Sequence, residues 1–218
     1  IACESCHSAG KDWFKVHSGF SGKKKNTESK QEAKARWAKV AGLGMIRPQA
    51  MYRLAKNCYS CHVVPKEELV NKGGHPAGSK FELVAWSQGE IRHNLWYTEG
   101  KENKRASTAR KRLMFVVGLA VELETALRAV GKATQKKSYA VLMARRAAVA
   151  RKKIIGAAKI LTNVPELMVA ARAAAAVGLK LNNDAQLSAA ADKVAAATKQ
   201  LVAKYDGSTF GAIDRAIP

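Results

Sequence analysis

The 218-residue chain has few cysteines, few aromatic residues and a deficit of acidic residues. Its four cysteines are too few for the disulfide framework of a small secreted domain, and a chain of this length can bury a core without one. No run of about 18 apolar residues occurs, so no segment is expected to span a membrane. No convincing alternation of apolar and polar residues occurs either, which predicts few or no strands.

Acidic residues are outnumbered by basic ones, 17 against 38, which gives a net charge of +21. Residues 1–100 carry 16 basic and 9 acidic side chains, and residues 101–218 carry 22 and 8. All histidines, cysteines and tryptophans lie in the first hundred residues, whereas the remainder is rich in alanine. The composition therefore predicts a chemically active domain over residues 1–100 and a basic helical domain over residues 101–218.

All four cysteines belong to two copies of one pentapeptide, Cys-x-x-Cys-His, at residues 3–7 and 58–62. This pentapeptide is the attachment site of a c-type haem, in which both thiols add to the vinyl groups of one porphyrin. The histidine that follows can then bind the iron as its proximal ligand. The sequence therefore predicts two covalently bound haem c groups, attached through Cys3, Cys6, Cys58 and Cys61, with His7 and His62 as proximal ligands.

Two other uses of the cysteines fit the spacing. Four cysteines in two Cys-x-x-Cys pairs could hold one zinc ion, and a single pair could act as a thioredoxin-like dithiol. Neither use gives a reason for the histidine that completes each copy. The paired, complete motifs favour haem.

The three remaining histidines, His17, His75 and His93, all lie near the two motifs in the sequence. The sixth position of each haem iron could be filled by histidine, methionine or water, so these three are candidate distal ligands. Met45 and Met51 are the competing candidates. The other methionines, Met114, Met143 and Met168, are expected to pack inside the helical domain.

Residues 1–97 resemble the multihaem cytochromes related to hydroxylamine oxidoreductase and its tetrahaem electron acceptor. After the second motif, the resemblance is carried by Gly74-His75-Pro76, Phe81-Glu82-Leu83, and His93 near Trp96. After the first motif, Trp13 followed by His17 is similar to the tryptophan and histidine of that family. The chain departs from the family in two spacings and in having only two haem motifs.

The resemblance implies that these histidines are distal ligands, often to a haem other than the nearest one in sequence. It implies His75 opposite His7, and either His93 or His17 opposite His62. The tryptophans are expected to cover the porphyrin faces and edges. They are Trp13, Trp37, Trp86 and Trp96.

Apolar periodicity predicts an all-α fold: a haem-binding N-terminal region with little regular sheet, then an antiparallel four-helix bundle. In the first region, Thr27 is expected to cap a helix that ends at residue 41. A second helix is expected to begin at Pro48 and to lead into the second motif. Residues 63–79 are expected to form a loop, followed by a helix at 80–88. The four bundle helices are expected at residues 104–131, 136–162, 167–178 and 183–205.

The second bundle helix carries one positive stripe, made of Arg145, Lys152 and Lys159 with Arg146 and Lys153 beside them, and its apolar positions include Val141, Leu142 and Val149. The excess of basic residues favours docking to an acidic redox protein, to neighbouring subunits of a multihaem assembly or to an anionic membrane surface. Nucleic acid is not expected, because no aromatic residues are interleaved with the basic ones.

The leading hypothesis is electron transfer by a dihaem cytochrome with two histidine ligands on each iron, which favours a low reduction potential. One alternative is an enzyme that acts on a small nitrogen compound at a five-coordinate haem, with Lys72 or Arg92 polarising it. Another is a haem-bearing structural subunit of a larger redox complex. Haem attachment of this type takes place outside the bacterial cytoplasm, so a periplasmic protein whose signal peptide has been removed is expected.

Overall fold

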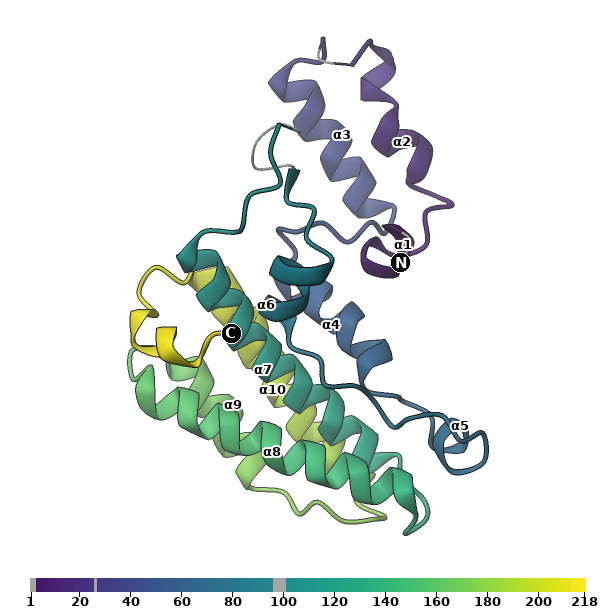
Figure 1. Cartoon of the computed structure of the whole chain (residues 1–218), viewed down its shortest axis with the longest axis vertical. Helices are drawn as coiled ribbons and strands as arrows, with labels where there is room; N and C mark the ends of the chain where they lie inside the picture. Colours follow the sequence, from purple (N-terminus) through teal and green to yellow (C-terminus); the bar gives the residue numbers. More distant parts are fainter. Residues whose placement is uncertain (1–2, 26, 96–100) are drawn as a thin grey trace. The chain divides into compact units, whose positions relative to one another are not determined.

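A computed structural model describes residues 3–25, 27–95 and 101–218, and this part of the chain contains helices and no strand (Figure 1). The all-α fold class predicted from the sequence is confirmed. The chain forms two compact units, which we call the N-terminal unit (Ile1–Asn57) and the C-terminal unit (Cys58–Pro218). The compositional boundary near residue 100 does not coincide with this division, because the segment after the second motif packs with the bundle.

The N-terminal unit consists of short helices around a small core. Its elements are α1 (Cys3–His7), α2 (Phe14–Ser18), the 3₁₀ turn η1 (Phe20–Gly22), α3 (Lys30–Gly42) and the first half of α4 (Met51–His62). Helix α2 packs against α3, and Trp13, Val40 and Met45 form the core, with Val16 and Trp37 packed against it. The core of this unit therefore brings together Trp13 and Trp37, two of the predicted haem-packing tryptophans.

Helix α3 begins two residues later than the sequence predicted. Ser29 and Glu32 form a capping box, in which the Ser29 hydroxyl accepts from the Glu32 amide and the Glu32 carboxylate accepts from the Ser29 amide. The prediction of Thr27 as the cap is wrong, because the Thr27 hydroxyl instead donates to the Lys24 carbonyl.

The C-terminal unit is built on four helices, α7 (Thr108–Gly131), α8 (Ser138–Ile160), α9 (Pro165–Ala175) and α10 (Asp184–Lys204). Helix α7 packs against α8 and α10, and α9 packs against the same two helices, which gives the four-helix bundle expected from the sequence (Figure 1). Large side chains such as Leu123, Met143 and Leu187 fill the interior. Alanines on the facing sides let the helices approach closely; they include Ala120, Ala126, Ala147, Ala150, Ala174, Ala190 and Ala191.

Residues 63–95 lie against the bundle. They contain α5 (Glu67–Asn71), α6 (Leu83–Ala85) and the π-helical turn η2 (Trp86–Glu90). Helix α5 interrupts the predicted loop, and the Glu67 carboxylate in its first turn accepts hydrogen bonds from the Thr134 and Gln135 amides in the turn between α7 and α8. The predicted helix at 80–88 is split between α6 and η2. A last 3₁₀ turn, η4 (Gly211–Ala216), ends the chain.

Several apolar side chains of the bundle are exposed where the sequence predicted packing. Met168 is 36% exposed, and Val141, Leu142 and Val149 on α8 are 41%, 43% and 55% exposed. Periodicity identified these positions as helical, and it correctly predicted Met143 and Ile154 as packed, but Ala147 and Ala150 complete the buried side of α8 in place of Val141, Leu142 and Val149. Within the described ranges, no helix has the length and apolar character needed to cross a bilayer.

Candidate functional site

The first motif lies on α1 in the N-terminal unit. Its two cysteines are three positions apart on a helix, which places both thiols on one side. Cys3 is exposed and Cys6 is half-buried, and neither forms a disulfide. The Asn57 side-chain amide donates to the carbonyls of Ser5 and Cys6 at 2.7 and 3.2 Å, so α4 fixes the end of α1.

His7 is held by a reciprocal pair of hydrogen bonds to Ile46. Its Nδ1 lies 2.7 Å from the Ile46 carbonyl oxygen, and the Ile46 amide donates to the His7 carbonyl at 3.0 Å. A carbonyl oxygen can only accept, so Nδ1 carries the proton, and in the neutral imidazole the lone pair is on Nε2. This is the tautomer that a histidine needs to bind a metal through Nε2.

The second motif forms the end of α4 and the start of the C-terminal unit. Cys58 is half-buried and Cys61 is exposed, again three positions apart on a helix, and neither forms a disulfide. Between them, Tyr59 is 1% exposed, and its ring packs edge-on against Phe81 at 5.1 Å between ring centres. Gly118 of α7 lies under Tyr59 and Leu83, where the absence of a side chain lets both approach the helix. Tyr59 thus anchors the motif on the bundle.

His62 is oriented by contacts to its ring and to its carbonyl group. Its Nδ1 lies 2.6 Å from the Ser79 hydroxyl oxygen, and its ring stacks on Phe81 with ring centres 4.1 Å apart and planes 16° apart. Trp86 lies at 5.6 Å from the same ring. The Ser79 amide donates to the His62 carbonyl at 3.2 Å. Nδ1 is therefore occupied at both motif histidines, by a carbonyl at His7 and by a hydroxyl at His62.

Arg146 of α8 links the second motif to the bundle. Its Nη1 donates to the carbonyls of His62 and Ser79, both at 3.1 Å. Its Nε lies 3.0 Å from a carboxylate oxygen of Glu122 on α7, and both side chains are nearly buried. The prediction that Arg146 belongs to the exposed positive stripe is therefore wrong. Its position on α8 turns it toward the end of α4, and Glu122 supplies its counter-charge.

Burial shifts the pKa of two candidate ligands, His62 and His17, and of the motif cysteine Cys6. Burial lowers the pKa of His62, and Arg146 lowers it further. Burial also lowers the pKa of His17, with a further contribution from Arg36. Both imidazoles are therefore favoured in the neutral form that a metal requires. Burial raises the pKa of Cys6, and the neighbouring Cys3 adds to this, which favours the protonated thiol.

His17 lies between two of the predicted haem-packing tryptophans. Its ring contacts Trp13 at 5.9 Å and Trp37 at 5.4 Å, both in edge-on geometry. Arg36 donates to the His17 carbonyl at 2.7 Å and forms a two-point ion pair with Glu28. The N-terminal unit thus holds His17 by an arginine on its carbonyl, as the C-terminal unit holds His62.

The other candidates are less constrained by the described structure. His75 and His93 are exposed, and their Nδ1 atoms lie 2.7 Å from the Pro76 carbonyl oxygen and 3.1 Å from the Ile91 carbonyl oxygen. The competing methionines Met45 and Met51 are buried in packed positions. Trp96 lies outside the described residues. The distal ligand assignments stay predictions.

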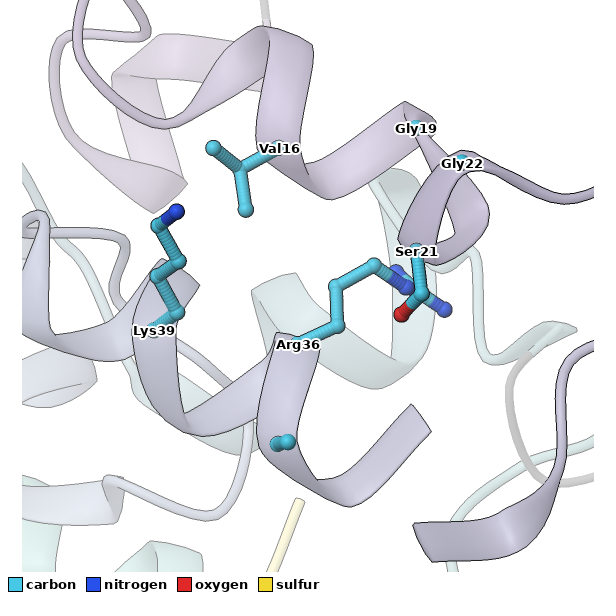
Figure 2. Close-up of a pocket in the computed structure, with 7 residues that line it drawn as sticks. Val16, Gly19, Ser21, Gly22, Arg36 and Lys39 are labelled. Atoms are coloured by element: carbon cyan, nitrogen blue, oxygen red, sulfur yellow. The ribbon is translucent and has the colours of Figure 1, made fainter. Parts of the chain in front are cut away.

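An open groove of about 340 Å³ lies between α2, η1 and α3 in the N-terminal unit (Figure 2). Val16 and Lys39 face each other across it, and the Arg36 side chain runs toward Ser21. Arg36 forms an ion pair with Glu28, and Lys39 is the second basic residue of the lining. The groove offers no converging set of polar groups for a ligand.

Two carboxylates of the N-terminal unit make its stability depend on pH. The hydrogen bond from Arg36 lowers the pKa of Glu28, and those from Lys23 and Ser29 lower the pKa of Glu32 to about 2. Both pKa values are below the ordinary value of 4.5, so their stabilisation is complete above that value and is lost as the pH falls toward 2. We expect Glu32→Gln to destabilise α3 at neutral pH and to have no effect near pH 2. Hydrogen exchange of the α3 amides at both pH values measures this; an equal effect at both would contradict it.

Comparisons with protein-family models, with curated proteins and with solved structures find no match to this chain. Within the ranges that the structure describes, no three or more histidine, cysteine or acidic side chains are grouped as a metal site. The candidate site thus consists of the two motifs and the residues that orient their histidines. Sequence reasoning missed Ile46 and Ser79, which contact the motif histidines, and Gly78, which packs closely against the His62 carbonyl group. It also placed Arg146 on the wrong side of its helix.

Proposed function

We propose that the chain is a dihaem c-type cytochrome that transfers electrons. Cys3 and Cys6 would attach one haem c and Cys58 and Cys61 the other, with His7 and His62 as proximal ligands. When bound, each haem supplies an iron centre that accepts and releases one electron. The observation that carries the proposal is the hydrogen bond that holds Nδ1 of each motif histidine in place, and at His7 the Ile46 carbonyl also keeps the proton on Nδ1, so that Nε2 has the lone pair for iron.

The protein residues have defined roles in this proposal. The carbonyl of Ile46 and the hydroxyl of Ser79 orient the two imidazoles, and Phe81 and Trp86 shield His62 from water. An apolar environment and the second partner of the imidazole both tune the reduction potential. Two of the three spare histidines, His17, His75 and His93, would complete the iron coordination and close both irons to substrates, and the third is left over.

The alternative uses have less support. Zinc bound by four cysteines, or a redox dithiol, leaves the orientation of His7 and His62 without a role. For the enzyme alternative, Lys72 is exposed and paired with Glu68, and Arg92 donates to the Gln88 carbonyl. Neither is aimed at a motif histidine by any contact in the described structure. We therefore favour a carrier located outside the bacterial cytoplasm, with an acidic redox protein or neighbouring subunits as partner.

Intact-protein mass and haem spectra test the proposal. After expression with haem-attachment machinery in a bacterial periplasm, we expect the mass of two haems on the wild type and of one haem on either the Cys3→Ala/Cys6→Ala or the Cys58→Ala/Cys61→Ala variant. Carbon monoxide should leave the spectrum of the reduced protein unchanged if both irons have two protein ligands. Zinc bound to the folded protein, together with four thiols that can be alkylated after unfolding, would contradict the proposal. A carbon monoxide complex would favour the enzyme alternative.

A further inference from the structure

The outward side of α8 exposes charges of a single sign together with apolar side chains. The helix contains no acidic residue. Leu142, Val149 and Ile160 are 43%, 55% and 49% exposed. The exposed cations between and beside them are Arg145, Lys152, Lys153 and Lys159. A basic face on a helix is ordinarily solvated, so it is the apolar side chains among the cations that need an explanation.

These residues repeat with the period of a helix that contacts another helix. Leu142, Val149 and Gly156 recur every seven residues, and so do Arg145, Lys152 and Lys159, three positions further on. Together they form one line along the exposed side of α8, which we call the α8 seam. A seven-residue repeat keeps residues on one side of a helix that can face a neighbouring helix, here with an apolar residue or glycine at the first position and a cation three positions later. At Gly156, no heavy atom lies within 4 Å of where a side chain would begin, which leaves a gap in the seam for a partner side chain.

The cations of the seam have no internal counter-charge. Within the described ranges, the ion pairs of the bundle use Arg112, Arg128, Arg146 and Lys204, and none involves Arg145, Lys152, Lys153 or Lys159. A partner that brought carboxylates to the seam would therefore gain attraction without breaking an existing pair.

We propose that the α8 seam is the docking site of an acidic amphipathic helix from a partner protein. The partner's apolar side chains pack on Leu142, on Val149 and in the gap at Gly156, while its carboxylates face Arg145, Lys152 and Lys159. The seven-residue spacing favours a helix over an anionic membrane, and the exposed apolar side chains of α8 include no aromatic residue that would anchor it in a lipid interface. It also favours a helix over nucleic acid, because stacking and groove contacts do not need a seven-residue period. The inference does not depend on haem.

A synthetic peptide on the full chain tests this inference. The probe has about four heptads, with leucine at position a and glutamate at d, e and g, and the control peptide has the same composition in scrambled order. Fluorescence anisotropy should show binding of the ordered peptide at least about tenfold tighter than binding of the scrambled one. Binding should weaken as salt rises, because the charges are exposed.

A matched pair of variants separates the seam from the net charge. Val149→Glu places a carboxylate in the seam, and Ala189→Glu places the same charge at an exposed position of α10. We expect Val149→Glu to weaken peptide binding by at least about tenfold and Ala189→Glu to change it by less than about twofold. Circular dichroism verifies that both variants fold. Equal binding of the two peptides, equal effects of the two variants, or binding only to phosphatidylglycerol vesicles would each overturn the inference.

Discussion

Replacing Gly78 by alanine is expected to lower the free energy of unfolding of the C-terminal unit by about 2–3 kcal/mol. A Cβ atom at this position would lie 2.5 Å from the His62 carbonyl oxygen and 2.7 Å from Nη1 of Arg146. The first of these atoms belongs to the backbone at the end of α4 and cannot rotate away. The φ angle of +158° adds strain for any residue with a side chain. Urea unfolding followed by far-ultraviolet circular dichroism measures the loss.

The same substitution should disturb the second motif and leave the first unchanged. Gly78 allows the chain to pass beside the end of α4, where Val63 and Gly78 form an isolated antiparallel bridge. That passage places the Ser79 hydroxyl on Nδ1 of His62. In the haem-loaded protein we expect one of two reduction potentials to shift, because the orientation and basicity of one proximal imidazole change.

Gly89 provides a matched control for this prediction. It lies in the same unit, and a Cβ atom there would meet no heavy atom within 4 Å. We expect Gly89→Ala to change the free energy of unfolding by less than about 0.5 kcal/mol. If Gly78→Ala is as stable as Gly89→Ala, the close approach at His62 does not limit the residue at position 78.

The sequence predicted best the features that local residues determine. The bundle helices α7, α8 and α10 follow from apolar periodicity sustained over more than five turns, so their existence did not depend on distant contacts. The two motifs could be identified because the chemistry of haem attachment needs its residues at fixed neighbouring positions. The Thr27 error has a local cause too, since two residues suited to capping compete within three positions.

Features that join distant parts of the chain could not be predicted in this way. The partner of the His62 carbonyl is Arg146, which follows it by 84 residues, and neither residue has a pattern that identifies the other. Periodicity also cannot tell which side of a helix has a neighbour, so Val149 was expected among the packed positions. One signal was present: Glu122 interrupts the apolar stripe of α7, and a carboxylate at such a position usually has a cation opposite.

Arg146→Met is expected to lower the free energy of unfolding by about 2–4 kcal/mol. The substitution removes one cation that donates hydrogen bonds to the carbonyls of His62 and Ser79 and forms an ion pair with the carboxylate of Glu122. Because Glu122 is nearly buried, its charge would be left without a partner. The double variant Glu122→Gln/Arg146→Met should recover part of the loss, since the unpaired charge is then absent.

Arg145→Met is the control for this change, because Arg145 precedes Arg146 on the same helix and is exposed. It removes the same charge from the unit, and we expect a change of less than about 0.5 kcal/mol. Parallel urea unfolding of the four proteins separates the role of net charge from that of the contact. If both single variants lose equal stability, Arg146 does not hold the end of α4. If only Arg146→Met is destabilised, the bundle fixes the orientation of His62, and the basic domain then supports the second motif directly.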